Sequence, residues 1–527
     1  MILDNADDVS FARREHGNDG AIRHEFSIAQ YLPQRDGGAV LITSRDNRAA
    51  FALTGKADYM ISIQPLNEKE ARTLIDRKIP TQLGDDNERE KLASSLELIP
   101  LALTQAAAYI TRRQRMTIGK YLDLLEAEEE KEGSVLKTEE SDIRRDPEVP
   151  NSVVRAWQIT FRQIRKQNDL SAELLSRMSL FDKQDVPEFL LRESGPDFAF
   201  EEAIETLLGY AIITMQRNET SFSMHRLVQL ATRDWLRQNE DLARQVEAAL
   251  KMLDQSYPTG NYENWTTCEM LEPHAESLLR NGAFSDCVRL SRAQIFCNRA
   301  WYYTEQGKYE IAEAMAKEGM HDRVELLGAE HPDTLTSMGG LALTYRYQGR
   351  WKEAKELQLQ VMETRKRVLG AEHPDTLISM GNLASTYRNQ GRWKEAEELQ
   401  LQVMETHKRV LGAEHPNTLI SMGNLASTYD HQGRWKEAEE LELQVMETRK
   451  KVLGAEHPAT LITMSNLAFT LKGQNRNQEA LGLMKKCVKL REQVLGLEHP
   501  HTIYSQDTLN EWEVEGLDLQ ASGSSVG

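Results

Sequence analysis

Apolar residues in the C-terminal half of the chain recur at helical spacing, and the whole arrangement returns every 42 residues. The dipeptide His-Pro marks the period, beginning at His331, His373, His415, His457 and His499. A repeat of fixed length predicts a solenoid, because one unit is too small to bury its own core and has to stack on its neighbours. Stacked units present a long concave surface, so this half is predicted to be a binding surface.

One repeat, residues 375–416, illustrates the two helices predicted in each unit. Leu383, Ala384 and Tyr387 lie on one stripe of the first helix. Gly391 ends that helix, because a helix end often needs a positive φ that glycine adopts without strain. The second helix is predicted to place these residues on its apolar side: Trp393, Ala396, Leu399, Val403, Val410 and Leu411. Tyr387 and Trp393 are expected to fill the space between neighbouring units.

Two short apolar segments near the N-terminus predict strands of an α/β sheet. Residues 1–3 lead into the acidic run 4–8, and residues 38–45 end in hydroxyl side chains and an arginine. The sequence between them has helical composition, so the two strands are expected to lie parallel. At the carboxyl ends of such strands Asp4 could hold Mg²⁺ and Arg45 could face a terminal phosphate. The alternative is that Asp4 caps a turn and Arg45 makes a surface ion pair.

Residues 151–240 carry the pattern of a winged helix. The β-prone runs 210–215 and 220–224 flank a short polar turn, which predicts a hairpin, and helical patterns precede and follow it. No basic recognition face is found in this segment, so a structural or switching role is expected instead of DNA binding. Residues 241–285 are predicted to form a helical connector to the repeats.

Composition narrows the classes of function. The 527 residues carry a formal net charge of -18, which argues against DNA or RNA as the main ligand. Neither a signal peptide nor a run of about 18 apolar residues is found, so a cytoplasmic protein with no membrane contact is expected. The four cysteines show no CxxC or metal-ligand spacing, which indicates a reducing compartment and no metal site.

Five short segments, taken in order, resemble the motifs of the NB-ARC (STAND-type, NLR-like) nucleotide switches. Residues 4–8 are similar to the Walker B segment and residues 42–45 to sensor 1. Residues 65–71 resemble the next block of that family, residues 99–103 its Gly-Leu-Pro-Leu-Ala block, and residues 223–226 its Met-His-Asp motif. The resemblance covers about residues 1–240.

The resemblance implies a nucleotide site. It would make Asp4 the carboxylate on the Mg²⁺ side, Arg45 the sensor of the γ-phosphate, Pro100 a contact to adenine and His225 a contact to the ADP β-phosphate. Asn5 and Arg226 stand where many relatives have acidic residues. No Gly-x4-Gly-Lys-[Ser/Thr] segment occurs in this sequence, although that loop supplies most of the grip on the phosphates.

We therefore expect no cofactor and no enzymatic activity for the chain as given. ADP or ATP with Mg²⁺ is expected only if a phosphate-binding loop precedes Met1. The first residues read like the inside of a strand, so the start at Met1 is expected to be a truncation or an incomplete gene model. An active STAND ATPase is the alternative if the true N-terminus carries the loop.

The C-terminal units resemble tetratricopeptide repeats, specifically the 42-residue kind found in kinesin light chains. Leucine, alanine, tyrosine, glycine, an aromatic residue and alanine stand in the expected places in three consecutive units. The first and last units drift from the pattern, as terminal caps do. The expected fold class is mainly α: a partial α/β NB-ARC module with a winged helix, followed by an α-solenoid of tetratricopeptide repeats.

The expected domain order follows from these segments. A charge-rich, weakly hydrophobic stretch is interpreted as a solvated linker. The predicted domains are the C-terminal part of an NB-ARC domain (1–125), the charged linker (126–150), a winged-helix-like domain (151–240), the helical connector (241–285), a solenoid of about five repeats (286–511) and a disordered tail (512–527).

Comparing the repeats with each other predicts the residues that contact a ligand. Residues 333–374 and 375–416 differ at six positions, and residues 375–416 and 417–458 also differ at six. Five of these twelve differences fall on first-helix positions that line the groove in the tetratricopeptide family. The alternative is that exposed sites simply drift. The predicted groove residues are Thr336, Leu343, Arg346, Tyr347, Ile378, Asn382, Ser385, Arg388, Asn389, Asn424, Ser427, Asp430, His431 and Asn466.

A groove of this kind suits a protein or peptide ligand and not a small metabolite. The leading hypothesis is an intracellular NLR-like sensor or scaffold with a vestigial or truncated ADP/ATP switch. The family resemblance implies a homo-oligomer formed on ligand binding. A kinesin-light-chain-like cargo adaptor is the alternative, and it would call for a heptad coiled coil before the repeats, which this sequence does not contain.

Overall fold

The computed structural model describes residues 2–3, 41–42, 66–135, 151–192, 197–280 and 284–523. The chain divides into two compact units, residues 1–132 and residues 133–527, and each is described by itself. Asp4 and Arg45 lie outside the described residues, so their nucleotide roles stay predictions.

The first unit contains a short parallel strand pair and a group of helices. Strands β1 (Ile2–Leu3) and β2 (Leu41–Ile42) pair in parallel with Ile2 opposite Leu41, which confirms the arrangement expected from the sequence. The helices are α2 (Glu68–Lys78), η4 (Thr81–Leu83), α3 (Asp86–Ser95), α4 (Pro100–Arg112) and α5 (Ile118–Val135).

Helix α5 corrects the predicted start of the charged linker. The linker was expected to begin at residue 126, but α5 continues to Val135. Glutamate and lysine dominate the sequence from Glu126 to Glu132, and both are strong helix formers. A charge-rich segment is therefore compatible with a continued helix as well as with a solvated linker.

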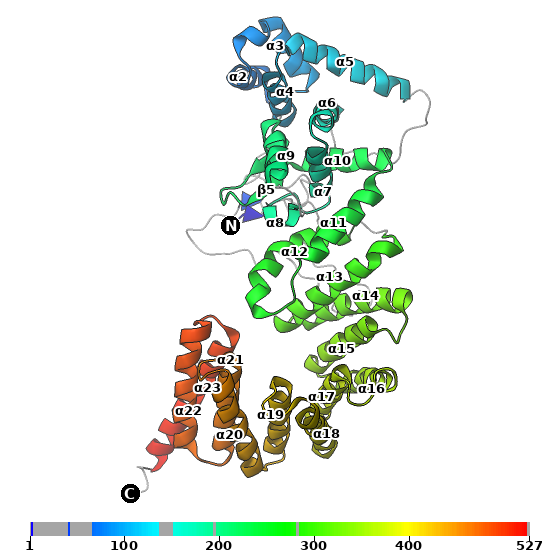
Figure 1. The fold of residues 1–527 in the computed structure, drawn as a ribbon. Helices are drawn as coiled ribbons and strands as arrows, with labels where there is room; N and C mark the ends of the chain where they lie inside the picture. The colour runs from blue at the N-terminus through cyan, green and yellow to red at the C-terminus, as the bar shows by residue number, and fades with distance from the viewer. Residues whose placement is uncertain are drawn as a thin grey trace, which may run out of the picture. The chain divides into compact units, whose positions relative to one another are not determined.

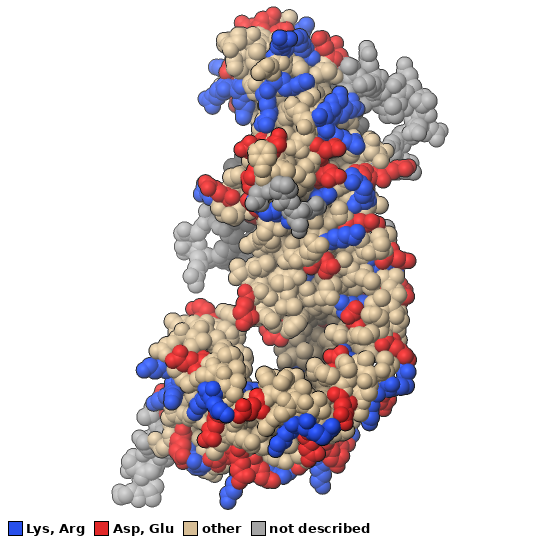
Figure 2. Space-filling model, viewed as in Figure 1, with Lys and Arg blue, Asp and Glu red and all other residues tan. Residues whose placement is uncertain are grey.

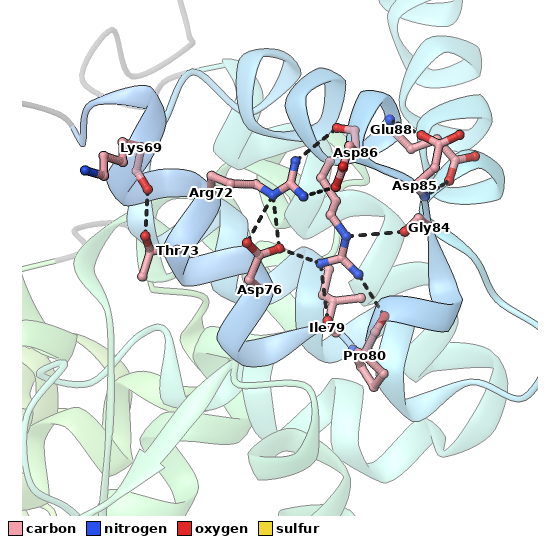
Figure 3. A network of polar contacts seen from close by, with 11 residues as sticks. Lys69, Arg72, Thr73, Asp76, Ile79, Pro80, Gly84, Asp85, Asp86 and Glu88 are labelled. Atoms are coloured by element: carbon pink, nitrogen blue, oxygen red, sulfur yellow. Dashed lines mark hydrogen bonds and ion pairs between the residues drawn. The ribbon is translucent and has the colours of Figure 1, made fainter.

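A buried arginine fixes the connection between α2 and α3 (Figure 3). The Arg89 side chain is 2% exposed, and its guanidinium donates hydrogen bonds to Asp76 Oδ1 at 3.0 Å and to the Pro80 carbonyl at 2.8 Å. Arg72 pairs with the same Asp76 and with Asp86 at the start of α3. These bonds satisfy loop carbonyls that have no partner in a regular helix.

The start of the second unit forms the predicted winged-helix arrangement. Its elements are α6 (Asn151–Gln167), α7 (Asp169–Met178), β3 (Val186–Pro187), α8 (Glu188–Leu191), α9 (Asp197–Gly209), β4 (Ile213–Met215), β5 (Ser221–Met224) and α10 (Arg226–Gln238). The strands form an antiparallel sheet in the order β3-β5-β4, and Ile213 lies opposite Met224, which confirms the hairpin. The rings of Trp157 and Phe161 stack 4.8 Å apart in the core.

A connector and a stack of helix pairs follow. The connector holds α11 (Leu242–Ser256), η5 (Tyr262–Asn264) and α12 (Trp265–Leu279). The pairs are α13 (Asp286–Glu305) with α14 (Tyr309–Leu327), α15 (Pro332–Tyr347) with α16 (Trp351–Val368), α17 (Pro374–Asn389) with α18 (Trp393–Leu411), α19 (Pro416–His431) with α20 (Trp435–Val452), and α21 (Pro458–Gly473) with α22 (Asn477–Leu495); α23 (Pro500–Gly523) closes the stack. Figure 1 shows a curved row with α15, α17, α19 and α21 along its inner side.

The residues that mark the repeat in the sequence mark helix boundaries in the structure. The Nδ1 atom of His373 accepts a hydrogen bond from the backbone N–H of Asp375 at 3.2 Å, and Pro374 begins α17. Gly391 follows α17 with a φ of 72°, and Gly412 follows α18 with a φ of 94°. The His-Pro pairs and these glycines therefore serve the fold, since each one starts or stops a helix.

Trp393 and Val410, two residues of the predicted apolar side of α18, are covered only in part. Trp393 is 41% exposed and Val410 is 52% exposed, whereas Leu383, Ala384 and Val403 are buried. Both exposed residues lie at the ends of α18, which has 19 residues against 16 in α17. The end turns of the longer helix extend past its partner, so only the middle of the stripe is covered.

The predicted disordered tail is wrong at its start. Helix α23 continues to Gly523, and Trp512 is 6% exposed. The Trp512 ring lies 5.2 Å from the ring of Phe469 on α21, and Leu509 joins the same core. The helix covers the apolar face of the last pair, which would otherwise be exposed to water.

Candidate ligand groove of the repeat domain

A recurring set of contacts joins neighbouring repeats at most of their joints and so shapes the groove. The Arg350 guanidinium lies 2.7 Å from Glu313 of the preceding pair and 4.2 Å from the centre of the Tyr345 ring. Arg434 makes the same two contacts, with Glu397 at 2.8 Å and with its own tyrosine ring. Because these residues are engaged in stacking the repeats, they are poor candidates for ligand contacts.

The predicted groove residues are accessible to solvent. All of them lie on first helices, which follow the inner side of the curve in Figure 1, and each is exposed or half-buried. Ile378 is 52% exposed and Tyr347 is 48% exposed, so large apolar side chains are open to a partner. Their roles as ligand contacts stay predictions.

Part of the predicted groove is a real pocket. A cavity of about 470 Å³ is lined by four of the predicted residues, Ser427, Asp430, His431 and Asn466, together with Glu442 and Thr470. We call this cavity the acidic pocket. Asp430 comes from α19, Glu442 from α20 and Thr470 from α21, and Arg491 of α22 and Tyr504 of α23 also line the cavity, so five helices build it.

The two carboxyl groups of the acidic pocket lie in an environment that disfavours their charge. Burial raises the pKa of Glu442 to about 7, and the nearby Asp430 contributes to the shift. Burial also raises the pKa of Asp430, against a smaller opposing effect of His431. The hydroxyl of Thr470 acts in the opposite direction and limits the rise of both pKa values.

The preceding repeats place the opposite charge at the same position. Arg346 and Arg388 correspond to Asp430, and burial together with the neighbouring Arg346 lowers the pKa of Arg388. Gln358 and Gln400 correspond to Glu442. The groove therefore changes from basic to acidic along the row of repeats. On the face seen in Figure 2, basic and acidic side chains are otherwise interspersed along the repeat domain.

Sequence reasoning missed Glu442, the most deeply buried carboxyl of the pocket. The signal was present, because the change from Gln400 to Glu442 is one of the six differences between those two repeats. It was passed over because the residue lies on a second helix, and the groove was assigned to first helices. Phe469, His501 and Tyr504, which also line the pocket, belong to the divergent last units.

The two described nucleotide candidates have local structural roles. Pro100 is the first residue of α4 and is exposed. His225 caps α10, because its Nδ1 accepts a hydrogen bond from the Leu227 N–H at 3.2 Å. They belong to different compact units, so the described residues do not define a nucleotide site, and both assignments stay predictions.

Three further observations concern the described residues only. No group of three or more His, Cys, Asp or Glu side chains there could hold a metal ion. Among the helices that the structure describes, none is both long and apolar enough to cross a lipid bilayer. All four cysteines are free thiols, with Cys268 and Cys487 buried.

Family comparisons agree with the repeat assignment. Tetratricopeptide repeat models match residues 291–367, 333–406, 375–451 and 460–501, and the chain therefore carries tetratricopeptide repeats over this region. A model described as a domain of unknown function (DUF7779) matches residues 162–241, which hold most of the winged-helix arrangement.

A curated relative is similar over a longer part of the chain. A nucleotide-binding leucine-rich repeat (NLR)-like protein of Hyaloscypha variabilis is 35% identical over 349 residues, which are 64% of this chain and 34% of that protein. The chain thus spans about a third of the length of this curated relative.

Two solved structures are also similar. A putative kinesin light chain of Podosopora anserina with nearly identical TPR-like repeats is 32% identical, covering 38% of this chain and 96% of that one, with a TM-score of 0.33. A STAND protein with a tetratricopeptide repeat sensor from Pyrococcus horikoshii is 13% identical, covering 91% of this chain and 73% of that one, with a TM-score of 0.35.

Proposed function

We propose that this chain is an NLR-like sensor or scaffold whose repeat groove binds a protein or peptide ligand. The observation that carries the proposal is the contrast between two sets of positions. Residues that join the repeats, namely Arg350, Arg434 and Arg476, make the same ion pair with the preceding repeat at three of the four joints. Groove positions change chemistry, as from Arg388 to Asp430, although stacking makes no such demand.

An extended chain suits the geometry of this groove. The side chains of successive first helices form rows, so a ligand can contact several repeats at once. Asn382 and Asn466 are exposed beside the row, and their amide groups can donate to and accept from a peptide backbone. The sign change between Arg388 and Asp430 would set the direction in which a charged peptide lies.

The nucleotide-switch part of the proposal rests on the motif order and on similarity to the NLR-like relative. For the chain as given, which contains no phosphate-binding loop motif, we expect ADP to bind far more weakly than micromolar. Displacement of a fluorescent ADP analogue tests this expectation, and tight binding would contradict it. A cytoplasmic location and oligomerisation on ligand binding belong to the same proposal.

Selection from a displayed library of random 12-residue peptides on the immobilised full chain tests the groove. We expect the chain to enrich a peptide family, and the R388D/N389H variant, which copies the next repeat, to enrich a different family. Burial already disfavours the Arg388 charge, so this variant should keep its stability within about 1 kcal/mol.

The matched control is K394E, which makes the same change of charge at an exposed second-helix position. It should enrich the same peptides as the unaltered chain. Failure of the unaltered chain to enrich any peptide, or equal effects of R388D/N389H and K394E, would contradict the proposed groove.

A further inference from the structure

We propose that the acidic pocket receives the guanidinium group of an arginine side chain on the bound peptide, held by Asp430 and Glu442. This inference rests on the proposed function of the groove and specifies its ligand. The pocket is the place where one side chain of an extended peptide could leave the groove surface and become buried.

The first argument is the lack of a partner for buried carboxyl oxygens. Glu442 is only 3% exposed, and its Oε2 atom has no hydrogen-bond partner; the buried Oδ1 atom of Asp430 has none either. Within the described ranges, no lysine or arginine lies at ion-pair distance from either carboxyl group. An unpaired buried carboxyl group is costly, and a cation that completes its bonding offsets that cost.

The second argument is that the fold does not need an acid at position 442. In the preceding repeat, Gln400 occupies the same place and accepts a hydrogen bond from Thr428 at 2.5 Å. Thr470 is the corresponding hydroxyl near Glu442. A neutral amide therefore occupies this position in the preceding repeat, although its Nε2 atom has no hydrogen-bond partner there. The acid at 442 appears together with the acid at 430, which points to a shared ligand.

The third argument concerns the other groups that face the pocket. Arg491 lines it, but this guanidinium is engaged with the carbonyl of His501 at 2.9 Å and with Ser505. The ring of His431 is bonded to the Ser427 carbonyl at 2.7 Å. Burial lowers the pKa of His501, which favours its neutral form. None of these three side chains makes an ion pair with Asp430 or Glu442 in the part of the chain that the structure describes.

The walls of the pocket favour arginine over lysine. Phe469 and Tyr504 both line it, and their ring centres lie 6.3 Å apart. A planar guanidinium can stack on aromatic faces while it bonds to carboxylates, and it is less strongly hydrated than an ammonium group. An arginine side chain therefore loses less hydration on entering such a pocket than a lysine side chain does.

The test uses the peptide family selected on the full chain. A selected peptide is synthesised with arginine, with lysine and with citrulline, which has a similar shape but no charge, and its affinity is measured by fluorescence anisotropy. We expect about a tenfold or greater loss on replacing arginine with citrulline, and a smaller loss with lysine.

The variant E442Q should show a similar loss toward the arginine peptide and little change toward the citrulline peptide. The matched control E440Q removes an exposed acid from the same helix and should bind as the unaltered chain does. Because glutamine is the natural residue at 358 and 400, E442Q is expected to fold, which thermal unfolding verifies.

Two failures are distinguishable. If the chain enriches no peptide, the result contradicts both the proposed function of the groove and this inference. If it enriches peptides without a shared arginine, or if E442Q and E440Q lose affinity equally, the result contradicts only the proposal that the acidic pocket binds arginine.

Discussion

The guanidinium of Arg350 lies 2.7 Å from the carboxylate of Glu313, across the joint between two successive repeats. The same pair recurs between Arg434 and Glu397 at 2.8 Å and between Arg476 and Glu439 at 2.7 Å. At the joint between α16 and α17, Lys355 stands in the place of the acid, so Arg392 has a basic residue where its counterparts have a carboxylate. One joint of the stack therefore lacks an interaction that the others share.

The variant K355E should strengthen this joint. It replaces a like-charged neighbour of Arg392 with the glutamate found at the equivalent positions. Because Arg392 is partly exposed and already pairs with Glu395, the gain should be small, raising the unfolding midpoint of the repeats by about 2 °C. Tryptophan fluorescence during heating measures it, since Trp351, Trp393 and Trp435 all lie in the repeats. The reverse variant E397K should lower the midpoint, and an unchanged midpoint in both would contradict the assignment.

The variant H407R should strengthen a contact between helices that is weak at this position. Arg323, Arg365 and Arg449 each donate to a hydroxyl of the next helix at 2.7–2.9 Å, whereas His407 Nδ1 lies 3.4 Å from Ser421 Oγ. A charged donor at this place should add about 1 kcal/mol to the unfolding free energy of the repeats.

The same histidine should make stability depend on pH. Burial lowers the pKa of His407 below 6.5, so the unfolded chain binds the proton more readily than the folded one. The contribution of His407 to the free energy of unfolding is present above pH 6.5 and is lost as the pH falls below that value. H407R should remove this loss. A pH profile identical to that of the unaltered chain would contradict the prediction.

The variant E442Q should stabilise the repeats at alkaline pH. Burial raises the pKa of Glu442 to about 7 from an ordinary value of 4.5, so the folded state holds the proton more tightly than the unfolded one. Stability is therefore lost as the pH rises from 4.5 through 7. At pH 8 the glutamine variant should be more stable by about 2–3 kcal/mol, and near pH 4 the difference should vanish.

This difference in stability can be measured by amide hydrogen exchange of α20, α21 and α22 at several pH values. The exchange rates are corrected for the pH dependence of intrinsic exchange. E440Q serves as the control, because that carboxyl is exposed. A difference between E442Q and the unaltered chain that did not change with pH would show that Glu442 is not the titrating group.

The variant R89A should destabilise the first unit strongly. Arg89 is 2% exposed and donates to Asp76 and to the buried Ile79 carbonyl, so its removal takes away a buried side chain and leaves a buried acceptor without its donor. We expect a loss of about 3–4 kcal/mol. Hydrogen exchange of α2 and α3 measures it locally. R72A, which removes a more exposed partner of the same Asp76, should cost much less; equal losses would argue against the buried network.

Local rules explain which parts of this fold could be predicted. His373, Pro374 and Gly391 set helix boundaries through contacts within a few residues, so the sequence pattern located them. The hairpin between β4 and β5 was predicted for the same reason, because its strands are joined by a short turn. The partial exposure of Trp393 and Val410 was not predicted, because it depends on where a neighbouring helix ends.

The amino-acid sequence by itself determined the period of the repeats, the ends of their helices and the chemistry that varies among them. Only the tertiary structure decided that Glu442 is buried and that it shares a pocket with Asp430. The physical reason is that helix signals act through neighbours along the chain, whereas burial and pKa depend on residues brought together from separate helices. The sequence shows that residue 442 is a glutamate. The burial of that glutamate and its nearness to Asp430 arise only because α19, α20 and α21 pack together.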